Sequence, residues 1–245
     1  MKRILIIGAT SAIAAECARL WAAKGAAFML AGRNADKLAA VADDLRVRGA
    51  AQLHTFQLDA DDVSRHAALL AATQQLGDID IALIAHGVLP DQAACEADPA
   101  LVVAQFTTNA TSQLALLTAL ATVFEKQQHG ALAVITSVAG DRGRPTNYAY
   151  GSAKAAVSAF CEGLRARLFK SHVSVTDIRP GFIATPMTAH LQLPAALVAQ
   201  PADIAPRIVA AIERGTDVVY TPAFWWLILF VVRYLPGFIF KRMKL

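Results

Sequence analysis

The stretch Arg3-Ile4-Leu5-Ile6-Ile7-Gly8-Ala9-Thr10-Ser11-Ala12-Ile13-Ala14 decides the fold expected of this chain. Residues 2–7 form an apolar run typical of a buried strand, which ends at a glycine and is followed by a helix-favouring segment at 11–24. A second apolar run lies at 27–31, so the chain opens with a strand, a helix and another strand. The first run is too short for the apolar region of a signal peptide.

The same alternation continues along the chain. We expect helices around Tyr150 and at 34–48, 61–76, 97–126 and 201–214, and strands at 51–56, 79–84, 131–136, 173–178 and 217–220. Strands that alternate with helices in this way form a parallel sheet covered on both faces. The prediction is an α/β fold with a Rossmann-like, doubly wound parallel sheet: one domain at 1–222, followed by an apolar and basic C-terminal tail at 223–245.

Composition restricts the classes of function. Of the 245 residues, 56% are hydrophobic and 17% are charged, and the formal net charge is +4. This modest charge, without a block of Lys and Arg interleaved with aromatic residues, does not favour nucleic-acid binding. Cys17, Cys95 and Cys161 lack the spacing of metal ligands, so we predict reduced thiols, a cytoplasmic protein and no metal site.

A hydroxyl, a phenol and an ammonium group lie within one short segment, Ser137 to Lys154. Tyr150 and Lys154 are four residues apart in an alanine-rich run, so both side chains should leave the same face of one helix. A cation beside a phenol lowers its pKa from about 10 toward neutrality, which suits acid–base chemistry. Ser137 follows an apolar run and is expected at the carboxyl end of a strand, where open α/β sheets bind ligands. Alone, the Tyr and Lys pair is equally an ordinary exposed helix pair, but its surroundings favour chemistry.

Taken together, these features resemble the short-chain dehydrogenase/reductase family, in its single-domain branch. The resemblance covers about residues 2–220 and rests on Gly8-Ala9-Thr10-Ser11-Ala12-Ile13-Ala14, Asn109, Ser137, Tyr150, Lys154 and Pro180-Gly181-Phe182-Ile183-Ala184-Thr185-Pro186. It implies an NAD(P)H-dependent oxidoreductase that interconverts a ketone and a secondary alcohol by hydride transfer.

The resemblance also implies a role for each candidate catalytic residue. Tyr150 is the acid and base, and Ser137 positions the carbonyl oxygen. Lys154 lowers the pKa of Tyr150 and binds the nicotinamide ribose, while Asn109 binds a water that links the lysine to solvent. Two alternatives stay open: a catalytically silent NADPH-sensing protein and a membrane-docked binding protein. The intact Ser137, Tyr150 and Lys154 argue against the first.

A narrower similarity concerns the substrate. Ala139-Gly140-Asp141-Arg142-Gly143-Arg144, Ala85-His86-Gly87 and the tail look most like the decaprenylphosphoryl-2-keto-ribose reductases and their uncharacterised relatives. This similarity implies a keto-sugar or a lipid-linked carbonyl substrate. Arg142 and Arg144 could grip a phosphate on such a substrate, or they could be ordinary surface arginines.

The turn after the first strand is expected to hold the pyrophosphate of the cofactor. Gly8 lets the backbone approach the phosphates, and the following helix offers free N–H groups. Thr10 and Ser11 add hydroxyls. The family pattern usually has two more glycines where this chain has Ala12 and Ala14, so the turn is less permissive.

The end of the second strand favours NADP (NADPH) over NAD. An NAD site usually places a carboxylate there, whereas an arginine suits the 2′-phosphate of NADP. Arg33 occupies the position, although it could also be a solvated arginine at a helix start. By resemblance, Asp59 lies at the edge of the adenine. His86 stands where the family more often has alanine; it could titrate near neutral pH, but we expect it to pack beside the adenosine half of the cofactor.

The resemblance completes a predicted cofactor site. Its residues are Gly8, Thr10, Ser11, Ile13, Arg33, Asp59, His86, Gly87, Tyr150, Lys154, Pro180, Gly181, Ile183 and Thr185. Thr185 is expected to meet the nicotinamide carboxamide, and residues 187–200 are expected to form a mobile lid over the substrate.

The tail has an unusual order of features. The nine apolar residues 224–232 are too few to cross a bilayer, which takes about 20. A break at 233–237, a second aromatic patch at 238–240 and the basic end Lys241-Arg242-Met243-Lys244 follow. We expect this tail to dock on the inner face of the membrane. Covering the substrate cleft or forming a subunit interface are the alternatives, and a homo-oligomer (dimer or tetramer) is expected.

Overall fold

The computed structural model describes residues 1–242; residues 243–245, the end of the predicted tail, lie outside the described part. Seven strands form one parallel sheet in the order β3-β2-β1-β4-β5-β6-β9. Their bounds are β1 Arg3–Ile7, β2 Ala27–Gly32, β3 Gln52–Gln57, β4 Ile81–Ile84, β5 Gly130–Ile135, β6 Val173–Pro180 and β9 Val218–Thr221. A small second sheet pairs β7 (Phe182–Ile183) with β8 (Val198–Ala199). The predicted doubly wound α/β fold is confirmed.

The sheet reverses its direction of growth between β1 and β4. The chain runs outward from β1 through β2 to β3, then crosses back to β4 and runs outward on the other side to β9. At the reversal Ile7 pairs with Ile84, and both strands end at the same edge of the sheet. Crevices at such a point, outside the carboxyl ends of the strands, are where open α/β sheets bind ligands.

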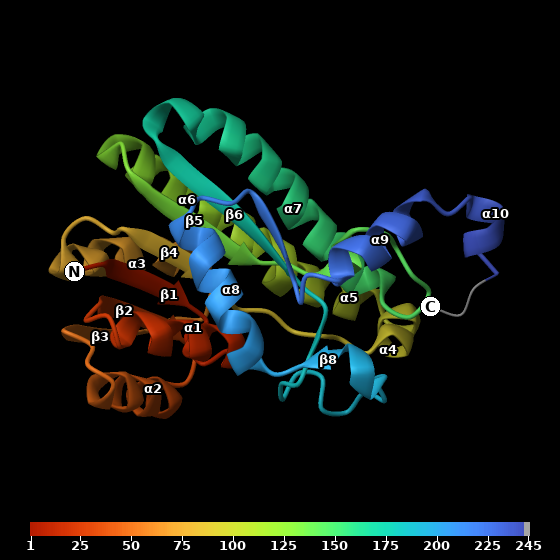
Figure 1. Cartoon of the computed structure of the whole chain (residues 1–245), viewed down its shortest axis with the longest axis horizontal. Coiled ribbons are helices and arrows are strands. Elements are labelled where there is room, and N and C mark those ends of the chain that lie inside the picture. Colours follow the sequence, from red (N-terminus) through yellow and green to blue (C-terminus); the bar gives the residue numbers. More distant parts are fainter. Residues whose placement is uncertain (243–245) are drawn as a thin grey trace.

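Helices cover both faces of the sheet (Figure 1). One layer consists of α1 (Ala12–Ala22), α2 (Ala35–Val47) and α8 (Pro201–Glu213), and the other of α3 (His66–Thr73), α6 (Ser112–Gln127) and α7 (Tyr148–Leu168). Side chains alternate between the two layers along each strand, as pleated strands require. In β1, Ile4 and Ile6 pack with the first layer, and Leu5 and Ile7 pack with the second.

The long helix predicted near 97–126 is present as one helical stretch over residues 99–127, which contains a π-helical turn, and a separate short helix precedes it. The elements of this region are α4 (Gln92–Ala97), α5 (Pro99–Phe106), a π-helical turn at Thr107–Thr111 and then α6. Asp98 caps α5 through the N–H of Ala100, and Pro99 begins the helix, because proline lacks the N–H that would continue α4. The π-helical turn carries Asn109, and such turns are frequent at functional sites.

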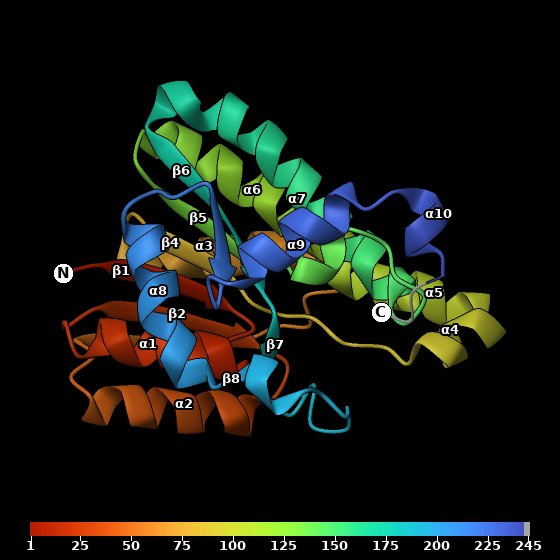
Figure 2. The same cartoon turned by 45° about the vertical axis from the view of Figure 1, so that its right-hand side comes forward.

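The tail forms two helices, α9 (Trp225–Tyr234) and α10 (Gly237–Phe240), near the end of the molecule that also carries α4 and α5 (Figure 2). Trp225 and Leu229, one helical turn apart, are 3% and 2% exposed and pack with Val138. The opposite face of α9 is exposed and apolar. Within residues 1–242, every helix is too short or too polar to cross a membrane.

Candidate active site

A cleft of about 450 Å³ opens at the carboxyl ends of the strands, at the point where the sheet reverses. The candidate catalytic residues Ser137, Tyr150 and Lys154 line it. So do all of the residues predicted to contact the cofactor, namely Gly8, Thr10, Ser11, Ile13, Arg33, Asp59, His86, Gly87, Tyr150, Lys154, Pro180, Gly181, Ile183 and Thr185. Residues that are up to 177 positions apart in the chain therefore meet in one cleft, Gly8 and Thr185 among them.

Ser137 is held by a tight turn that follows β5. Its hydroxyl oxygen accepts a hydrogen bond from the backbone N–H of Ala139 at 3.0 Å. Gly140 lets this turn approach α7 closely, because a Cβ there would lie 2.8 Å from the backbone nitrogen of Ala155. The turn therefore places Ser137 against the helix that carries Tyr150 and Lys154.

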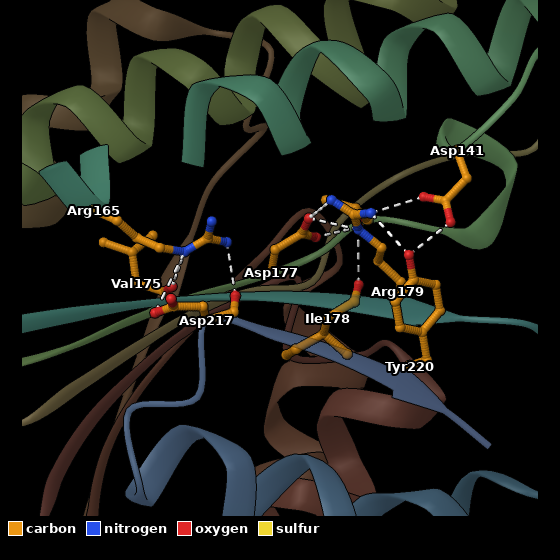
Figure 3. A network of polar contacts seen from close by, with 9 residues as sticks. Asp141, Arg165, Val175, Asp177, Ile178, Arg179, Asp217 and Tyr220 are labelled. Atoms are coloured by element: carbon orange, nitrogen blue, oxygen red, sulfur yellow. Dashed lines mark hydrogen bonds and ion pairs between the residues drawn. The ribbon is translucent and has the colours of Figure 1, made fainter. Parts of the chain in front are cut away.

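A buried polar network anchors the same turn to β6 and β9 (Figure 3). Arg179 donates to Asp141 at 2.8 Å, and its guanidinium also pairs with Asp177 at 2.8 Å. The hydroxyl of Tyr220 donates to the second oxygen of Asp141 at 2.7 Å. Since Asp177 is fully buried and Arg179 nearly so, these bonds are strong constraints on the position of the turn.

Tyr150 and Lys154 lie one turn apart near the start of α7. The ammonium nitrogen of Lys154 lies 5.8 Å from the centroid of the Tyr150 ring and donates to the carbonyl of Ile135 at 3.0 Å. Burial lowers the pKa of Lys154 to about 8, and the charge of Asp177 opposes this shift.

The pKa of Tyr150 moves in the opposite direction to the sequence-based prediction. Burial raises it to about 12, with a smaller opposing effect from the Ser137 hydroxyl. The loss of hydration of a buried phenolate outweighs the attraction of a lysine whose ammonium points at a backbone carbonyl. Tyr150 is therefore protonated in this structure, which is the state of a proton donor.

Asn109 is fully buried and, unlike the other candidates, lies behind the cleft wall. Its amide exchanges two hydrogen bonds with the backbone of Val88, both 2.9 Å long, and it also donates to Gln105 at 3.1 Å. Gln105 in turn donates to the carbonyl of Ala149, next to Tyr150. Gln105 positions Asn109 and the start of α7, and the sequence analysis missed it. It lies four residues before Asn109, and this helical spacing could have indicated a contact between the two side chains.

Gly8 follows β1 in a conformation that favours glycine, with φ of +81°. A Cβ at this position would lie 2.5 Å from the backbone nitrogen of His86, so no other residue fits. Ser11 begins α1 but does not use its side chain to cap the helix, which leaves its hydroxyl free at the cleft. Ala12 lines the cleft, and Ala14 is buried. The turn has the free N–H groups and the open backbone that a dinucleotide phosphate needs.

The far end of the cleft is exposed and charged. Arg33 lines it, and Lys37, one helical turn later, adds a second cation that the sequence analysis missed. Asn34 lies between them and caps α2 by accepting from the N–H of Lys37 at 2.8 Å. Asp59 lines the same end, and its carboxylate accepts from the N–H of Asp61.

His86 is a packing residue in this structure. A ring nitrogen lies 2.9 Å from the hydroxyl of Ser112, and the backbone carbonyl of His86 accepts from Gln113 at 2.6 Å. Burial, together with the charge of Lys154, lowers the pKa of His86 to about 3. The ring is therefore neutral at physiological pH and is unsuited to proton exchange.

The two arginines of the loop before α7, Arg142 and Arg144, make different contacts. The guanidinium of Arg142 donates to the carbonyls of Val232 and Leu235, at the end of α9, and lies 3.8 Å from the ring centroid of Phe240. The interpretation of Arg142 as a phosphate ligand is therefore wrong, because its side chain holds the tail. Arg144 lines the cleft.

The segment after β7 borders the cleft through Thr185, Met187 and Leu191. The hydroxyl of Thr188 donates to the carbonyl of Ile183 at 2.5 Å and accepts from the N–H of Thr185. Gly181, at the end of β6, packs under the tail, since a Cβ there would lie 1.9 Å from the indole nitrogen of Trp225. Within residues 1–242, His, Cys, Asp and Glu side chains form no group of three or more that could hold a metal ion.

Comparison with known proteins places this geometry in a family. The family model described as short chain dehydrogenase matches residues 2–195. An uncharacterised oxidoreductase of Mycobacterium tuberculosis (strain H37Rv) is 41% identical over 243 residues, which cover 98% of this chain and 96% of the relative. An uncharacterised oxidoreductase of Streptomyces coelicolor is 34% identical over 99% of this chain and 96% of its own length.

Solved structures share the fold. A short chain dehydrogenase/reductase family protein has a TM-score of 0.78 and 28% identity, covering 89% of this chain and 94% of its own. An actinorhodin polyketide ketoreductase crystallised with NADPH has a TM-score of 0.82 and 21% identity, covering 91% and 97%. With the family match over most of its length, this chain belongs to the short-chain dehydrogenase family of oxidoreductases.

Proposed function

We propose that this protein is an NADPH-dependent ketoreductase that interconverts a ketone and a secondary alcohol. The observation that carries the proposal is the meeting of Ser137, Tyr150 and Lys154 in one cleft, at the point where the sheet reverses. A bound nicotinamide cofactor supplies the hydride in such a reaction, and the protein supplies orientation and the proton.

Each of these residues is suited to one part of the proton chemistry. Tyr150, with a pKa raised to about 12, carries the proton that a reduced carbonyl oxygen needs. The Ser137 oxygen accepts from the N–H of Ala139, and the hydroxyl hydrogen, which is directed to Tyr150 in this structure, can donate to the same carbonyl oxygen when a substrate is bound. Lys154 lies beside Tyr150 and can donate to ribose hydroxyls, while Asn109 and Gln105 hold the start of α7 in place.

The preference for NADPH rests on the charged end of the cleft. Arg33 and Lys37 both line this end, and the position that would carry an acid in an NAD site is Arg33 itself. Two exposed cations suit a 2′-phosphate, which arginine binds through parallel hydrogen bonds.

The narrower similarity to decaprenylphosphoryl-2-keto-ribose reductases leads us to propose a keto-sugar or a lipid-linked ketone as substrate. The test is NADPH oxidation by the wild-type protein with keto-sugars, keto-lipids and small ketones, each with and without anionic liposomes. Oxidation with one class, above the rate without ketone, is the expected result. Firm NADPH binding without oxidation by any class would instead favour a sensing protein.

We further propose that the protein is cytoplasmic and docks on the inner face of the membrane through the tail. Exposed apolar side chains cover the outer side of α9 and α10, namely Phe224, Trp226, Leu227, Phe230, Val231, Tyr234, Phe238 and Ile239. Arg233 and Lys241 are exposed at the border of this face. Aromatic rings flanked by cations suit the headgroup region of an anionic bilayer.

Co-sedimentation with anionic liposomes tests the docking. The double variant Trp226→Glu, Phe230→Glu keeps the buried face of α9 and should lose salt-sensitive binding, since these stacked rings lie at the centre of the apolar face. Val47→Glu changes an exposed apolar residue on α2, away from the tail, and should bind as wild type does. If the wild type does not bind liposomes and the double variant has an altered oligomeric state, this face is a subunit interface instead.

We also propose that the protein forms a homo-oligomer, either a dimer or a tetramer. Leu101 and Val103 on α5 are exposed apolar residues outside the tail, as contacts between subunits require. Light scattering of wild type and of Val103→Glu measures this, with a smaller particle expected for the variant. A monomeric wild type would contradict it.

A further inference from the structure

Arg144 is a cation in the cleft wall without a counter-ion. Its Nε is buried and has no hydrogen-bond acceptor among residues 1–242. Burial lowers the pKa of Arg144, while the charge of Asp141 opposes this. Asp141 is already paired with Arg179 and Tyr220, with a side chain only 2% exposed (Figure 3). A guanidinium that is partly buried in a cleft without a partner is suited to bind an anion there.

Asn147 adds a second, independent observation. It stands at the position that begins α7, where an asparagine side chain normally accepts from the backbone N–H groups of the first turn. Here the side chain makes no such bond, and its Oδ1 is buried without a partner among the described residues. The residue lines the cleft instead. Buried polar atoms are almost always hydrogen-bonded, so an unpaired acceptor on a residue that lines the cleft indicates a ligand that donates to it.

The location of these atoms points to the substrate. Arg144 and Asn147 both belong to the loop that joins Ser137 to Tyr150, and Asn147 lies one helical turn before Tyr150. The groups suited to cofactor phosphates are on other elements, the turn after β1 and the start of α2, which carry Gly8 and Arg33. A ligand held by Arg144 and Asn147 is therefore next to the reacting hydroxyls.

We propose that Arg144 and Asn147 form a subsite for an oxyanion, carboxylate or phosphate, carried by the ketone substrate. Arg144 donates to the oxyanion, and Oδ1 of Asn147 accepts from a hydroxyl group beside it. The preferred substrates are then anionic, hydroxylated ketones. This inference rests on the proposed reductase function and adds the class of substrate to it.

Equilibrium binding tests the subsite without turnover. The Tyr150→Phe variant, saturated with NADPH, is titrated with dihydroxyacetone phosphate and with dihydroxyacetone in a calorimeter. We expect the phosphate ester to bind about tenfold or more tightly than the neutral ketone, which corresponds to one charge-assisted hydrogen bond. In the same background Arg144→Gln should remove this preference and leave dihydroxyacetone binding unchanged. A second pair, 4-oxopentanoate and its methyl ester, shows whether a carboxylate is accepted as well as a phosphate.

Arg142→Gln is the matched control. It removes an equal charge two positions away, from a side chain that contacts the tail, and should keep the preference for the anion. An unchanged NADPH affinity shows that each variant is folded. Asn147→Asp places a carboxylate beside the oxyanion and should weaken binding of the phosphate ester more than Asn147→Ala does.

Kinetics on the otherwise wild-type chain give a second readout. Arg144→Gln should raise KM for the anionic ketone about tenfold with kcat nearly unchanged, and Arg144→Lys should recover part of the loss. A wild type without preference for either anionic ketone would overturn the subsite, as would equal losses in Arg142→Gln and Arg144→Gln. If the binding preference holds while no ketone is reduced, the subsite stands and the reductase function fails.

Discussion

The two ends of the cleft differ in how they treat charge. At the end that carries Arg33 and Asp59, the charged side chains are exposed to solvent. At the other end Lys154 is 2% exposed, and burial moves the pKa values of Lys154 and Tyr150 by about two units or more from their ordinary values. Under the proposed function, one end would select its ligand by solvated charge, whereas the other would use desolvation to set the protonation of the reacting groups.

This difference predicts the order of mutational effects. A group that holds a proton in a buried site has no replacement when it is removed, so the loss appears in the rate. An exposed cation contributes less, because solvent and salt screen it. Changes at the buried end should therefore exceed changes at the exposed end, and the following experiments test that order.

The largest effect is expected for Tyr150→Phe. The substitution removes the proton donor and keeps the ring, so kcat should fall by about 10²-fold or more while the NADPH affinity stays nearly constant. Steady-state kinetics and fluorescence titration of NADPH measure the two quantities. A variant that keeps more than about one tenth of the wild-type kcat, a barrier change below about 1.4 kcal/mol, excludes Tyr150 as the proton donor.

The next effect concerns stability and pH at Lys154. Its pKa in the folded state, about 8, is below the ordinary value of 10.5, so between these pH values the unfolded chain binds more protons. The free energy of unfolding therefore rises with pH over this window and is lower below pH 8. Lys154→Met abolishes this dependence. The free energy of unfolding of wild type, relative to that of the variant, should therefore increase by about 3 kcal/mol between pH 7 and pH 11.

Denaturant unfolding at several pH values measures this shift. Lys170→Met, which changes an exposed lysine after the end of α7, serves as the control and should follow the wild-type pH dependence. If Lys154→Met and Lys170→Met give the same profile, Lys154 titrates like a solvated lysine, and the contrast between the two ends of the cleft is lost.

A smaller effect is expected at the exposed end, for Arg33→Ala. Only the 2′-phosphate loses a charge-assisted partner, so NADPH should bind about 10- to 100-fold more weakly while NADH binding changes little. Arg46→Ala, on α2 but outside the cleft, is the control and should leave both cofactors unaffected. Equal losses for NADPH and NADH in Arg33→Ala would show that this arginine does not recognise the phosphate.

Much of this architecture could be predicted from local pattern. Apolar runs of strand length, such as residues 131–135, alternate with helical segments and predicted the parallel sheet. A strand that is buried on both faces needs apolar side chains at nearly every position. The same periodicity placed Ser137 at a strand end and put Tyr150 and Lys154 on one helix face. The cleft followed from the topology of the fold.

The remainder depends on contacts that local sequence does not encode. The sign of the pKa shift at Tyr150 depends on how far the folded chain excludes water from the ring, which spacing does not reveal. Likewise, Arg142 and Arg144 are two positions apart in one loop, and only the tail, some 90 residues later, separates their roles. The π-helical turn carries Asn109, whose side chain bonds to the backbone of Val88, and a helix pattern indicates neither the turn nor these bonds.

The tail illustrates the same limit. Its composition suggested docking on a membrane, with covering the cleft or forming a subunit interface as alternatives, but α9 presents two faces. Trp225 and Leu229 cover the turn at Val138, while Trp226 and Phe230 face solvent. The sequence shows the apolar run. Which of its residues are buried and which are exposed depends on how α9 packs against the turn at Val138.

The smallest effect is expected for Ser11→Ala, which separates cofactor binding from helix stability. Replacing a capping side chain by alanine usually costs a helix about 1 kcal/mol. Ser11 begins α1 without a side-chain cap, so the Tm should stay unchanged. Its free hydroxyl faces the cleft, and its loss should weaken NADPH binding about fivefold, or ~1 kcal/mol, as for one hydrogen bond. Asp98→Ala is the reciprocal control, because Asp98 caps α5 and does not line the cleft. That variant should lower the Tm by about 2–4 °C without any effect on NADPH. If Ser11→Ala lowers the Tm as Asp98→Ala does and leaves NADPH binding intact, Ser11 stabilises the helix and does not contact the cofactor.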